Sequence, residues 1–357
     1  CQGDGTWDGA APTCTCDVTC NGICTDIQMD DHNCGGCGVT CPTVPSPSTT
    51  QCMLGRCLVT LATLTSWGSI RNIVVDSSSV YWTANGVGAG GTNVDQDSVS
   101  KVPLGGGAPT TFVSNDNILG NIAVDASSIY WVRMPSPMTD STTYIMKVPL
   151  AGGTPTTLCK GGLSAIAVDA SSVYWITGGA LMKVSRDGGT PAAVVAVQGY
   201  SLSIAVDATD VYWTNYGTTD VLSEHTIDDT VMKVPVGGGT PTTLASGQDS
   251  PRSLVVDATS VYWTAGSSVM KVPLDGGSPI TLASGQFLLS SIAVDGSSVY
   301  WTNGADLYSG GAVMKVPLGG GTPTKLALAQ DGPGSIAVDD TSVYWKTRTA
   351  VMKLSPK

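Results

Sequence analysis

Few side chains in this chain have the types and spacing of a catalytic or metal site. His225 lies in Ser223-Glu-His-Thr-Ile-Asp-Asp229, where a serine, a histidine and a carboxylate stand close together, but no nucleophile motif surrounds the serine. Asn93-Val-Asp95-Gln-Asp97 alternates oxygen ligands as calcium loops do, yet lacks the Gly and terminal Glu of an EF-hand. We therefore expect no catalytic residue, no bound metal and no cofactor. A propeller hydrolase or lyase and a calcium loop stay as alternatives.

Cysteine is concentrated at one end of the chain. Ten of the 11 cysteines lie within residues 1–57, a density typical of disulfides in an oxidising, extracellular compartment. Cys34 and Cys37 form a CxxC pair that could serve redox or zinc chemistry, but the surrounding cysteines and the lack of a second pair favour disulfides. The residues expected in disulfides are Cys1, Cys14, Cys16, Cys20, Cys24, Cys34, Cys37, Cys41, Cys52 and Cys57. The last eight of these should form four bridges of undetermined connectivity. Cys159 is either a buried small residue or a bridge to this arm.

Composition limits the partners and the fold class. The net charge of −11 and the pI near 4.4 argue against binding to nucleic acid or to an anionic membrane. No run of 18 apolar residues exists, so we expect no membrane insertion. Glu224 is the single glutamate, and good helix formers are scarce beside 44 glycines and 20 prolines. An all-β fold with many turns follows.

One sequence motif recurs seven times, and its repeats must form the scaffold that positions any functional residues. It begins with Ile-Ala-Val-Asp or a close variant, and Tyr-Trp begins five residues after the Asp. The aspartates are Asp76, Asp125, Asp169, Asp207, Asp257, Asp295 and Asp339. The tryptophans are Trp82, Trp131, Trp175, Trp213, Trp263, Trp301 and Trp345. Repeats of about 40–50 residues holding four short β-type runs are typical of propeller blades, so we predict a seven-bladed β-propeller.

The fifth repeat shows how one blade is expected to form. Strands a to d, counted from the axis, are predicted at 253–257, 261–264, 269–272 and 281–283. Asp257 should hydrogen-bond its own backbone in a tight a–b turn, and glycines should supply the positive φ of the c–d turn. Pro273 must sit where strand c leaves the ladder, because proline lacks a donor.

Two recurring side chains have a structural interpretation. Tyr and Trp of strand b should point to opposite faces of a blade and pack against its two neighbours. One lysine follows at a fixed place in each repeat, and we expect it to bind an Asp or a carbonyl; a ring of ligand-binding lysines is the alternative. These lysines are Lys101, Lys147, Lys183, Lys233, Lys271, Lys315 and Lys353.

The two ends of the repeat region complement each other. The last repeat stops at Lys357 before any strand d, whereas Leu58–Thr63 matches the strand d sequence Thr242–Ser246. We predict that 58–63 pairs with the strand at 351–354 and closes the ring, which removes two exposed edges.

The repeated phrase Val261-Tyr-Trp-Thr264…Val269-Met-Lys-Val-Pro-Leu-Asp-Gly-Gly277 resembles the YWTD propellers of low-density-lipoprotein-receptor ectodomains, and bacterial surface propellers of that kind even more. The likeness covers 58–357 and implies a propeller. That family has six blades rather than seven, and the Asp after its Tyr-Trp-Thr is missing here. The residues in its place are Ala84, Arg133, Thr177, Asn215, Ala265, Asn303 and Thr347.

Two further resemblances divide the N-terminal segment. Residues 1–15 are similar to the last third of a sushi module, through Cys1-Gln-Gly-Asp-Gly-Thr-Trp7 and Ala11-Pro-Thr-Cys14. Residues 16–57 resemble a small Cys-rich module of bacterial secreted proteins, through Cys20-Asn-Gly-Ile-Cys24 and Asn33-Cys-Gly-Gly-Cys37. The predicted domains are therefore 1–15, a disulfide-rich module at 16–57, and the propeller at 58–357. The Pro-rich run at 42–50 is a candidate for O-glycosylation.

Uneven loops indicate where a function would lie. The b–c connections are long at 84–98, 133–144, 215–230 and 303–312, and they share one end of the ring with the d–a connections; we call this end the long-loop face. The residues predicted to bind there are Trp67, Asp95, Asp97, Tyr200, Asp220, His225, Asp228 and Phe287. We expect an extracellular or cell-surface, non-enzymatic scaffold that binds a protein or glycan, chiefly through 84–98 and 215–230. The alternative is a structural subunit that binds copies of itself head to tail through the Cys-rich arm and builds a filament.

Overall fold

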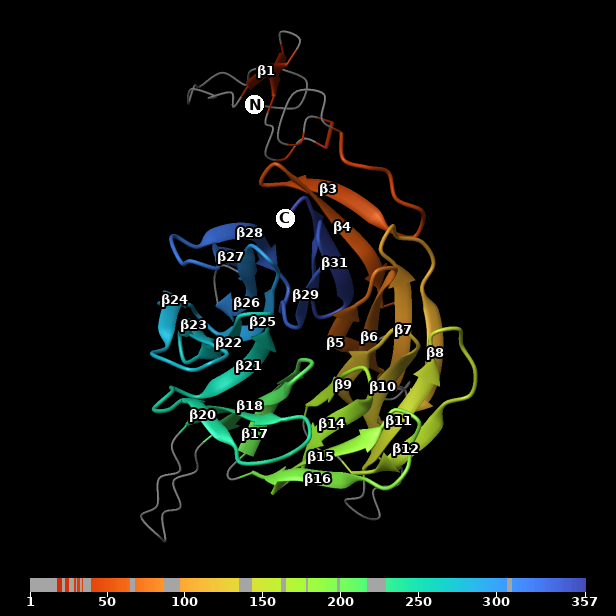
Figure 1. Cartoon of the computed structure of the whole chain (residues 1–357). Coiled ribbons are helices and arrows are strands. Elements are labelled where there is room, and N and C mark those ends of the chain that lie inside the picture. Colours follow the sequence, from red (N-terminus) through yellow and green to blue (C-terminus); the bar gives the residue numbers. More distant parts are fainter. Residues whose placement is uncertain are drawn as a thin grey trace.

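Seven antiparallel sheets stand around a central axis in the computed structural model of the protein (Figure 1). The predicted all-β, seven-bladed propeller is therefore confirmed. The structure describes residues 29, 31–32, 34, 40–64, 68–86, 97–134, 143–161, 165–177, 179–197, 200–216, 229–306 and 310–357, together with the backbone of β1 (Val18–Cys20) and β2 (Ile23–Thr25). These described residues contain no helix that is long and apolar enough to cross a membrane.

Six blades have four strands each, written here from strand a to strand d. Blade 1 is β5 (Gly68–Val75), β6 (Ser79–Gly86), β7 (Asp97–Pro103) and β8 (Thr110–Asp116). Blade 2 is β9 (Ile118–Val124), β10 (Ser128–Arg133), β11 (Tyr144–Pro149) and β12 (Thr156–Lys160). Blade 3 is β13 (Ile166–Val168), β14 (Ser172–Ile176), β15 (Ala180–Ser185) and β16 (Ala192–Ala196). Blade 4 is β17 (Tyr200–Val206), β18 (Asp210–Tyr216), β19 (Thr230–Pro235) and β20 (Thr242–Ala245).

The remaining blades follow the same order. Blade 5 is β21 (Pro251–Val256), β22 (Ser260–Ala265), β23 (Ser268–Pro273) and β24 (Ile280–Ala283). Blade 6 is β25 (Leu289–Val294), β26 (Ser298–Asp306), β27 (Gly310–Pro317) and β28 (Thr324–Gln330). Blade 7 has five strands: β29 (Ile336–Val338), β30 (Val343–Lys346), β31 (Ala350–Ser355), β4 (Arg56–Thr63) and β3 (Thr49–Met53).

The turns of blade 5 show why the repeated residues are needed. Asp257 Oδ1 accepts hydrogen bonds from the backbone N–H groups of Thr259 and Ser260, at 2.7 and 2.8 Å, which fixes the a–b turn. In the c–d turn, Gly276 N–H donates to Pro273 O at 2.9 Å, and the φ of Gly276 is 87°. Pro273 is the last residue of β23. Both turn assignments and the place of the proline agree with the prediction.

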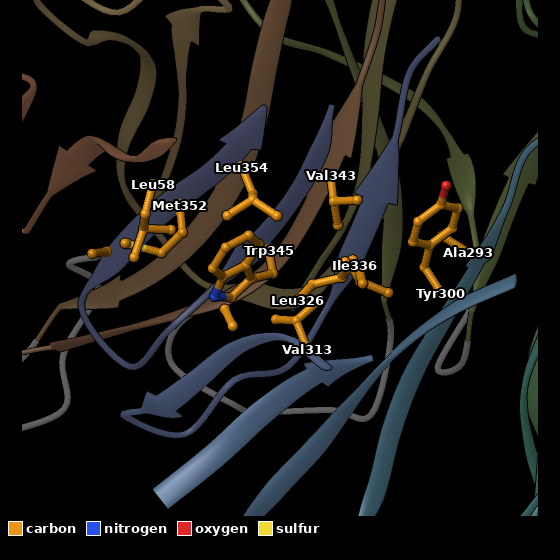
Figure 2. Packing of buried hydrophobic residues seen from close by; sticks show 12 residues of the cluster. Leu58, Ala293, Tyr300, Val313, Leu326, Ile336, Val343, Trp345, Met352 and Leu354 are labelled. Atoms are coloured by element: carbon orange, nitrogen blue, oxygen red, sulfur yellow. The ribbon is translucent and has the colours of Figure 1, made fainter. Parts of the chain in front are cut away.

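Seven core clusters of the described residues lie between neighbouring blades, and each contains the tyrosine of one blade and the tryptophan of the next. Between blades 6 and 7, Tyr300 and Trp345 share a cluster with Val313, Leu326 and Leu354, and Figure 2 shows the Trp345 indole among these aliphatic side chains. The same pairing recurs around the ring and ends with Tyr344 of blade 7 against Trp82 of blade 1. The prediction that these aromatics join neighbouring blades is confirmed.

The ring closes through the N-terminal strand of the repeat region. β4 pairs antiparallel with β31, with Leu58 opposite Leu354 and Ala62 opposite Val351, as predicted (Figure 1). Lys353 Nζ, on β31, then donates to Leu104 O of blade 1 at 2.9 Å. The two ends of the repeat region are thus joined by the β4–β31 backbone ladder, and the Lys353 bond ties blade 7 to blade 1.

The Cys-rich segment continues into blade 7. β3 pairs with β4 as a hairpin in which Cys52 lies opposite Cys57. Disulfides join Cys34 to Cys52 and Cys41 to Cys57. The domain boundary predicted between 57 and 58 therefore falls inside β4, and residues 49–57 belong to the propeller sheet.

The remaining cysteines have separate outcomes. Cys1, Cys14, Cys16 and Cys37 lie outside the described residues, as do the side chains of Cys20 and Cys24. Cys159, on β12, is free and buried, which selects the buried small residue from the two alternatives. Burial raises the pKa of its thiol to about 11.

The arm also fastens blade 7 to blade 1. The Ser48 hydroxyl donates to Leu61 O of β4 at 2.9 Å and accepts from Gly107 N–H, in the c–d turn of blade 1, at 3.1 Å. The buried Ser48 hydroxyl thus links blade 7 to blade 1.

The b–c connections are partly described. Those of blades 1, 2 and 4 lie mostly outside the described residues, at 87–96, 135–142 and 217–228. The connection predicted as a loop at 303–312 is mostly strand, because β26 extends to Asp306 and β27 begins at Gly310, with Asn303 opposite Ala312. In blade 5 the connection is a tight turn between Ala265 and Ser268.

Candidate ligand site at the propeller axis

Three of the eight residues predicted to bind on the long-loop face fall within the described structure. Asp97 begins β7, Tyr200 begins β17, and Phe287 precedes β25 with 57% of its surface exposed. The predicted residues outside the described structure are Trp67, Asp95, Asp220, His225 and Asp228. The serine–histidine–carboxylate group of the alternative, enzymatic interpretation lies outside it as well. Leu288, beside Phe287, is also exposed and has a φ of 46°, a strained value for a residue with a Cβ.

Asp97 positions an arginine at the axis. Its Oδ2 accepts a hydrogen bond from Ile118 N–H of blade 2 at 2.9 Å and lies 3.8 Å from Nη2 of Arg71. Burial raises the pKa of Asp97, and the opposing effects of Ile118 and Arg71 only partly offset it. The carboxylate is thus already engaged by protein donors, and Asn93 and Asp95 of the candidate calcium loop lie outside the described residues.

A cavity of about 430 Å³ lies on the axis, with walls built from the strand a region of every blade. Its lining residues lie just before, at the start or near the middle of these strands, which follow the d–a connections of the long-loop face. They are Arg71, Asn72, Asn121, Ile122, Ala165, Ile166, Ser203, Ile204, Arg252, Ser253, Ser290, Ser291 and Ser335. The size is within the range of small-molecule sites.

Small polar residues form a ring around this cavity. They occupy the position four residues before the repeated Asp of each blade, and only blade 3 has an apolar residue there, Ala165. At four successive junctions the serine hydroxyl of one blade accepts a hydrogen bond from a backbone N–H of the next. The pairs are Ser203 with Leu254 (3.0 Å), Ser253 with Ile292 (3.3 Å), Ser291 with Ile336 (3.4 Å) and Ser335 with Ile73 (3.1 Å).

The hydrogen bonds of these small polar residues are not the same at all seven junctions. Ile122 pairs with Trp131 in the same register as Leu254 with Trp263, so its N–H also points toward the axis. In the described structure, however, Asn72 forms no such bond to Ile122; nor do Asn121 and Ala165 at the following two junctions. The wall at blades 2 to 4 therefore presents backbone donors that the preceding blade does not occupy.

Two arginines give the cavity positive charge. Arg71 and Arg252 occupy the equivalent position in blades 1 and 5, on opposite sides of the ring (Figure 1, β5 and β21), and both side chains are exposed. Arg252 forms no ion pair with any described residue. Lys346, at the end of β30, does not line the cavity: its Nζ donates to Gly332 O at 3.4 Å.

The lining of the cavity is rich in hydrogen-bond donors. Arginine, asparagine and serine supply donors for an anion and for hydroxyl groups. None of the described lining residues is a carboxylate, histidine, cysteine or tyrosine, so the lining offers no general acid–base pair.

The repeated lysines bind the protein itself. Lys147 Nζ and Lys183 Nζ each donate at 2.7 Å to a carbonyl that follows strand c of the next blade, on Arg186 and Val236. Lys101, Lys271 and Lys353 do the same, whereas Lys233 contacts Asp210 at 3.4 Å. For these six lysines the predicted Asp or carbonyl partner is confirmed. For Lys315, burial lowers the pKa of the side chain.

Within the described residues, one cluster has the composition of a metal site: Cys34, Cys41 and Cys57, whose sulfurs lie within 4.8 Å of one another. All three are disulfide-bonded, Cys34 to Cys52 and Cys41 to Cys57. Their sulfurs therefore do not act as thiolate ligands in this structure.

Comparison with known proteins gives the fold and no family. No family model and no curated protein matches the chain. Among solved structures, an oligogalacturonate lyase in complex with manganese aligns at a TM-score of 0.63 and 12% identity, over 88% of this chain and 95% of that one. The β-propeller domain of the Trilobed protease from Pyrococcus furiosus aligns at 0.59 and 9%, over 81% and 95%.

A third structure is the extracellular domain of a one component system from B. thetaiotaomicron, with a TM-score of 0.58 and 12% identity, over 82% of this chain and 39% of that one. At these identities the likeness establishes the propeller fold alone. The protease propeller is described as having an open velcro topology, whereas here β4 pairs with β31 and closes the ring.

Proposed function

We propose that the protein is an extracellular, non-catalytic propeller that binds a ligand over the axial cavity of its long-loop face. The observation that carries this proposal is the cavity itself, with Arg71 and Arg252 exposed among a ring of hydroxyl and amide groups. The serines of the polar ring, such as Ser253, accept hydrogen bonds from a neighbouring blade. Among the described residues, the two arginines have one ion pair, the 3.8 Å contact of Arg71 with Asp97.

The extracellular location rests on cysteine chemistry. Two disulfides lie within the described residues, and disulfides persist in oxidising compartments. The resemblance of the repeats to bacterial surface propellers supports the same location.

The non-catalytic role rests on the lining of the cavity. Propellers of this shape include an oligogalacturonate lyase, so the fold leaves the question of catalysis open, and the site must answer it. Here the described lining supplies donors and positive charge without an acid–base pair.

A glycan array probed with the full chain tests the proposal. We expect retention of a defined glycan class, loss of that retention in Arg71→Gln/Arg252→Gln, and recovery of the ligand chemically unchanged. A double variant of two exposed lysines, Lys160→Gln/Lys325→Gln, removes the same charge from outer strands and serves as the control. Retention that survives the arginine changes, or a ligand that is cleaved, would refute this function.

A structural subunit is the second candidate, favoured by the way the arm is fixed. Residues 48–63 belong to the sheet of blade 7 or contact it, and two disulfides anchor the segment before them. An arm held in one orientation suits head-to-tail assembly. Electron microscopy and sedimentation of the native protein distinguish filaments from monomers.

A further inference from the structure

We propose that the ligand of the axial cavity is an acidic sugar: a saccharide of one or two residues, or the end of a longer glycan, with one anionic group. This inference rests on the proposed binding function and specifies its ligand. It combines the charge of the cavity, the donors in its wall and the charge of the whole molecule.

The positive charge of the cavity favours an anionic ligand. Arg71 and Arg252 extend from opposite sides of the same cavity, and the described lining contains no carboxylate to neutralise them. Arg71 is partly paired with Asp97 at 3.8 Å, which leaves Arg252 as the guanidinium without a described ion pair. An arginine presents two parallel donors that match the geometry of a carboxylate or phosphate.

The donors and acceptors in the cavity wall favour a ligand with several hydroxyl groups. Asn72 and Asn121 place amides at blades 1 and 2, and Ser290 adds a hydroxyl at blade 6. Ile166 and Ile204 pair with the tryptophans of their blades in the same register as Ile122, so all three N–H groups face this space from blades 2 to 4. Short donors and acceptors spaced around a ring fit a ligand that carries several hydroxyls in different directions, as a pyranose does.

Size and net charge limit the ligand further. A cavity of about 430 Å³ is at the small end of ligand sites, so it accommodates one or two sugar residues. The chain carries a net charge of −11, which repels a polyanion outside the cavity while the local arginines attract a single anionic group within it. A nucleic acid or a highly sulfated chain is therefore disfavoured.

Calorimetry on the full chain tests the inference with four probes: galacturonate and glucuronate, which carry a carboxylate, glucose 6-phosphate, which carries a phosphate, and neutral galactose. We expect the acidic sugars to bind at least tenfold more tightly than galactose, and the affinity to fall as salt is raised. Uronate against sugar phosphate identifies which anion the arginines recognise, and preference for either one supports the proposal.

Single variants locate the effect. Arg252→Gln should weaken binding of the acidic sugar by about tenfold or more, since a hydrogen bond to a charged group is lost, and Arg252→Lys should recover only part of it. Lys325→Gln removes one exposed charge far from the axis and should leave the affinity unchanged.

Two results overturn the inference. If galactose binds as tightly as the uronates, the anion is not recognised, although a glycan site at the axis, and with it the proposed function, survives. If none of the four probes binds while the glycan array gives a cavity-dependent signal, the ligand is of another class. If the array also gives no signal, the proposed function fails as well.

Discussion

At the scale of single residues, the repeated Asp does more than shape a turn. Its Oδ1 binds the a–b turn, and its Oδ2 accepts a hydrogen bond from the Tyr hydroxyl of strand b at 2.6–2.9 Å in all seven blades. The tyrosine ring is buried between blades, so the carboxylate partners a hydroxyl group that the core would otherwise leave unpaired. The five-residue spacing of Asp and Tyr is therefore a single structural device.

Removal of one such hydroxyl should destabilise the ring measurably. In Tyr262→Phe the ring still packs between blades 5 and 6, but the bond to Asp257 Oδ2 at 2.8 Å is lost. A hydrogen bond to a charged group contributes about 1.5–3 kcal/mol, and we expect the free energy of unfolding to fall by that amount. Urea titration measures it.

Tyr216→Phe is the matched control, since Tyr216 is 38% exposed at the end of β18. An equal loss of stability in both variants would mean that the Asp–Tyr bond contributes nothing specific.

A second residue pattern partners the tryptophans. Gln248, Gln286 and Gln330 stand 15 residues before their tryptophans, and each accepts a hydrogen bond from the indole Nε1 at 3.1–3.2 Å. The fixed spacing was visible in the sequence, but nothing in a glutamine alone indicates a buried partner. In blades 1 to 3 the indole nitrogens of Trp82, Trp131 and Trp175 have no partner among the described residues.

Gln286→Ala should leave the fully buried indole of Trp301 without its acceptor. We expect a loss of about 1–3 kcal/mol in the free energy of unfolding, which is the usual cost of an unpaired buried donor. Gln51→Ala, on the exposed face of β3, is the control and should change stability little. If Gln286→Ala is as stable as the control, the Trp301 indole does not depend on this acceptor.

At the scale of elements, the closing hairpin is where the arm and the ring become one structure. β4 pairs with β31 on one edge and with β3 on the other, and Cys57 lies opposite both Cys52 and Ser355. A disulfide from Cys57 to Cys41 thus holds the strand that closes the propeller.

We expect Cys41→Ser/Cys57→Ser to lower the free energy of unfolding by about 3 kcal/mol, because the bridge closes a loop with a sequence separation of 16 residues. Unfolding in urea, monitored by tryptophan fluorescence, gives the value. Cys159→Ala, on the outer strand β12, removes a free thiol as a control. A double variant as stable as that control would show that β4 needs no covalent support.

The elements that were predicted correctly are those whose sequence recurs in every repeat. Strand positions, both turn types and the pairing of β4 with β31 follow from a phrase whose seven copies share turn and core residues. β3 was missed because Pro42–Thr50 reads as a Pro-rich linker, and the strand begins only at its end. The extension of β26 and β27 was missed because its residues, 304–306 and 310–311, are mostly glycine and aspartate and have turn composition.

The axial site was missed for a different reason. The polar ring is made of Ser, Asn and Ala, which look interchangeable in a sequence, and it has meaning only once seven strands meet at one axis. Arg71 and Arg252 are far apart in the chain, and no local pattern connects them. The residues predicted to bind come instead from the uneven b–c connections and from the d–a connections, and most of them lie outside the described residues.

At the scale of the whole molecule, the seven Asp–Tyr pairs make stability depend on pH at both extremes. Burial alone would raise the pKa of Asp257, but hydrogen bonds from Thr259, Tyr262 and Ser260 outweigh it and lower the pKa. The same balance lowers the pKa of the other six aspartates, to about 2 for Asp125. Burial, followed by the neighbouring carboxylate, raises the tyrosine pKa, to about 12 for Tyr174, Tyr262 and Tyr300.

The directions of these pKa shifts predict that the free energy of unfolding is constant at intermediate pH and falls at both acid and alkaline pH. A carboxyl whose pKa is lowered by folding stabilises the fold above its unfolded value of 3.8, and this contribution is lost as the pH falls toward about 2. A phenol whose pKa is raised stabilises the fold below its unfolded value of 10.0, and this is lost as the pH rises toward about 12. The raised pKa of Asp97 acts in the opposite sense at the acid edge, but it is one group against seven.

Urea midpoints measured across this pH range should therefore stay level between the two edges and fall beyond each. Near-ultraviolet absorbance should show the buried tyrosines ionising together with unfolding, later than exposed ones. Tyr262→Phe removes one pair and should make both edges shallower, because Asp257 then titrates nearer its ordinary pKa and one phenol is absent. A midpoint that holds level down to the pKa of Asp125, or tyrosines that ionise at their ordinary pKa while the ring is folded, would mean that these pairs do not couple folding to protonation.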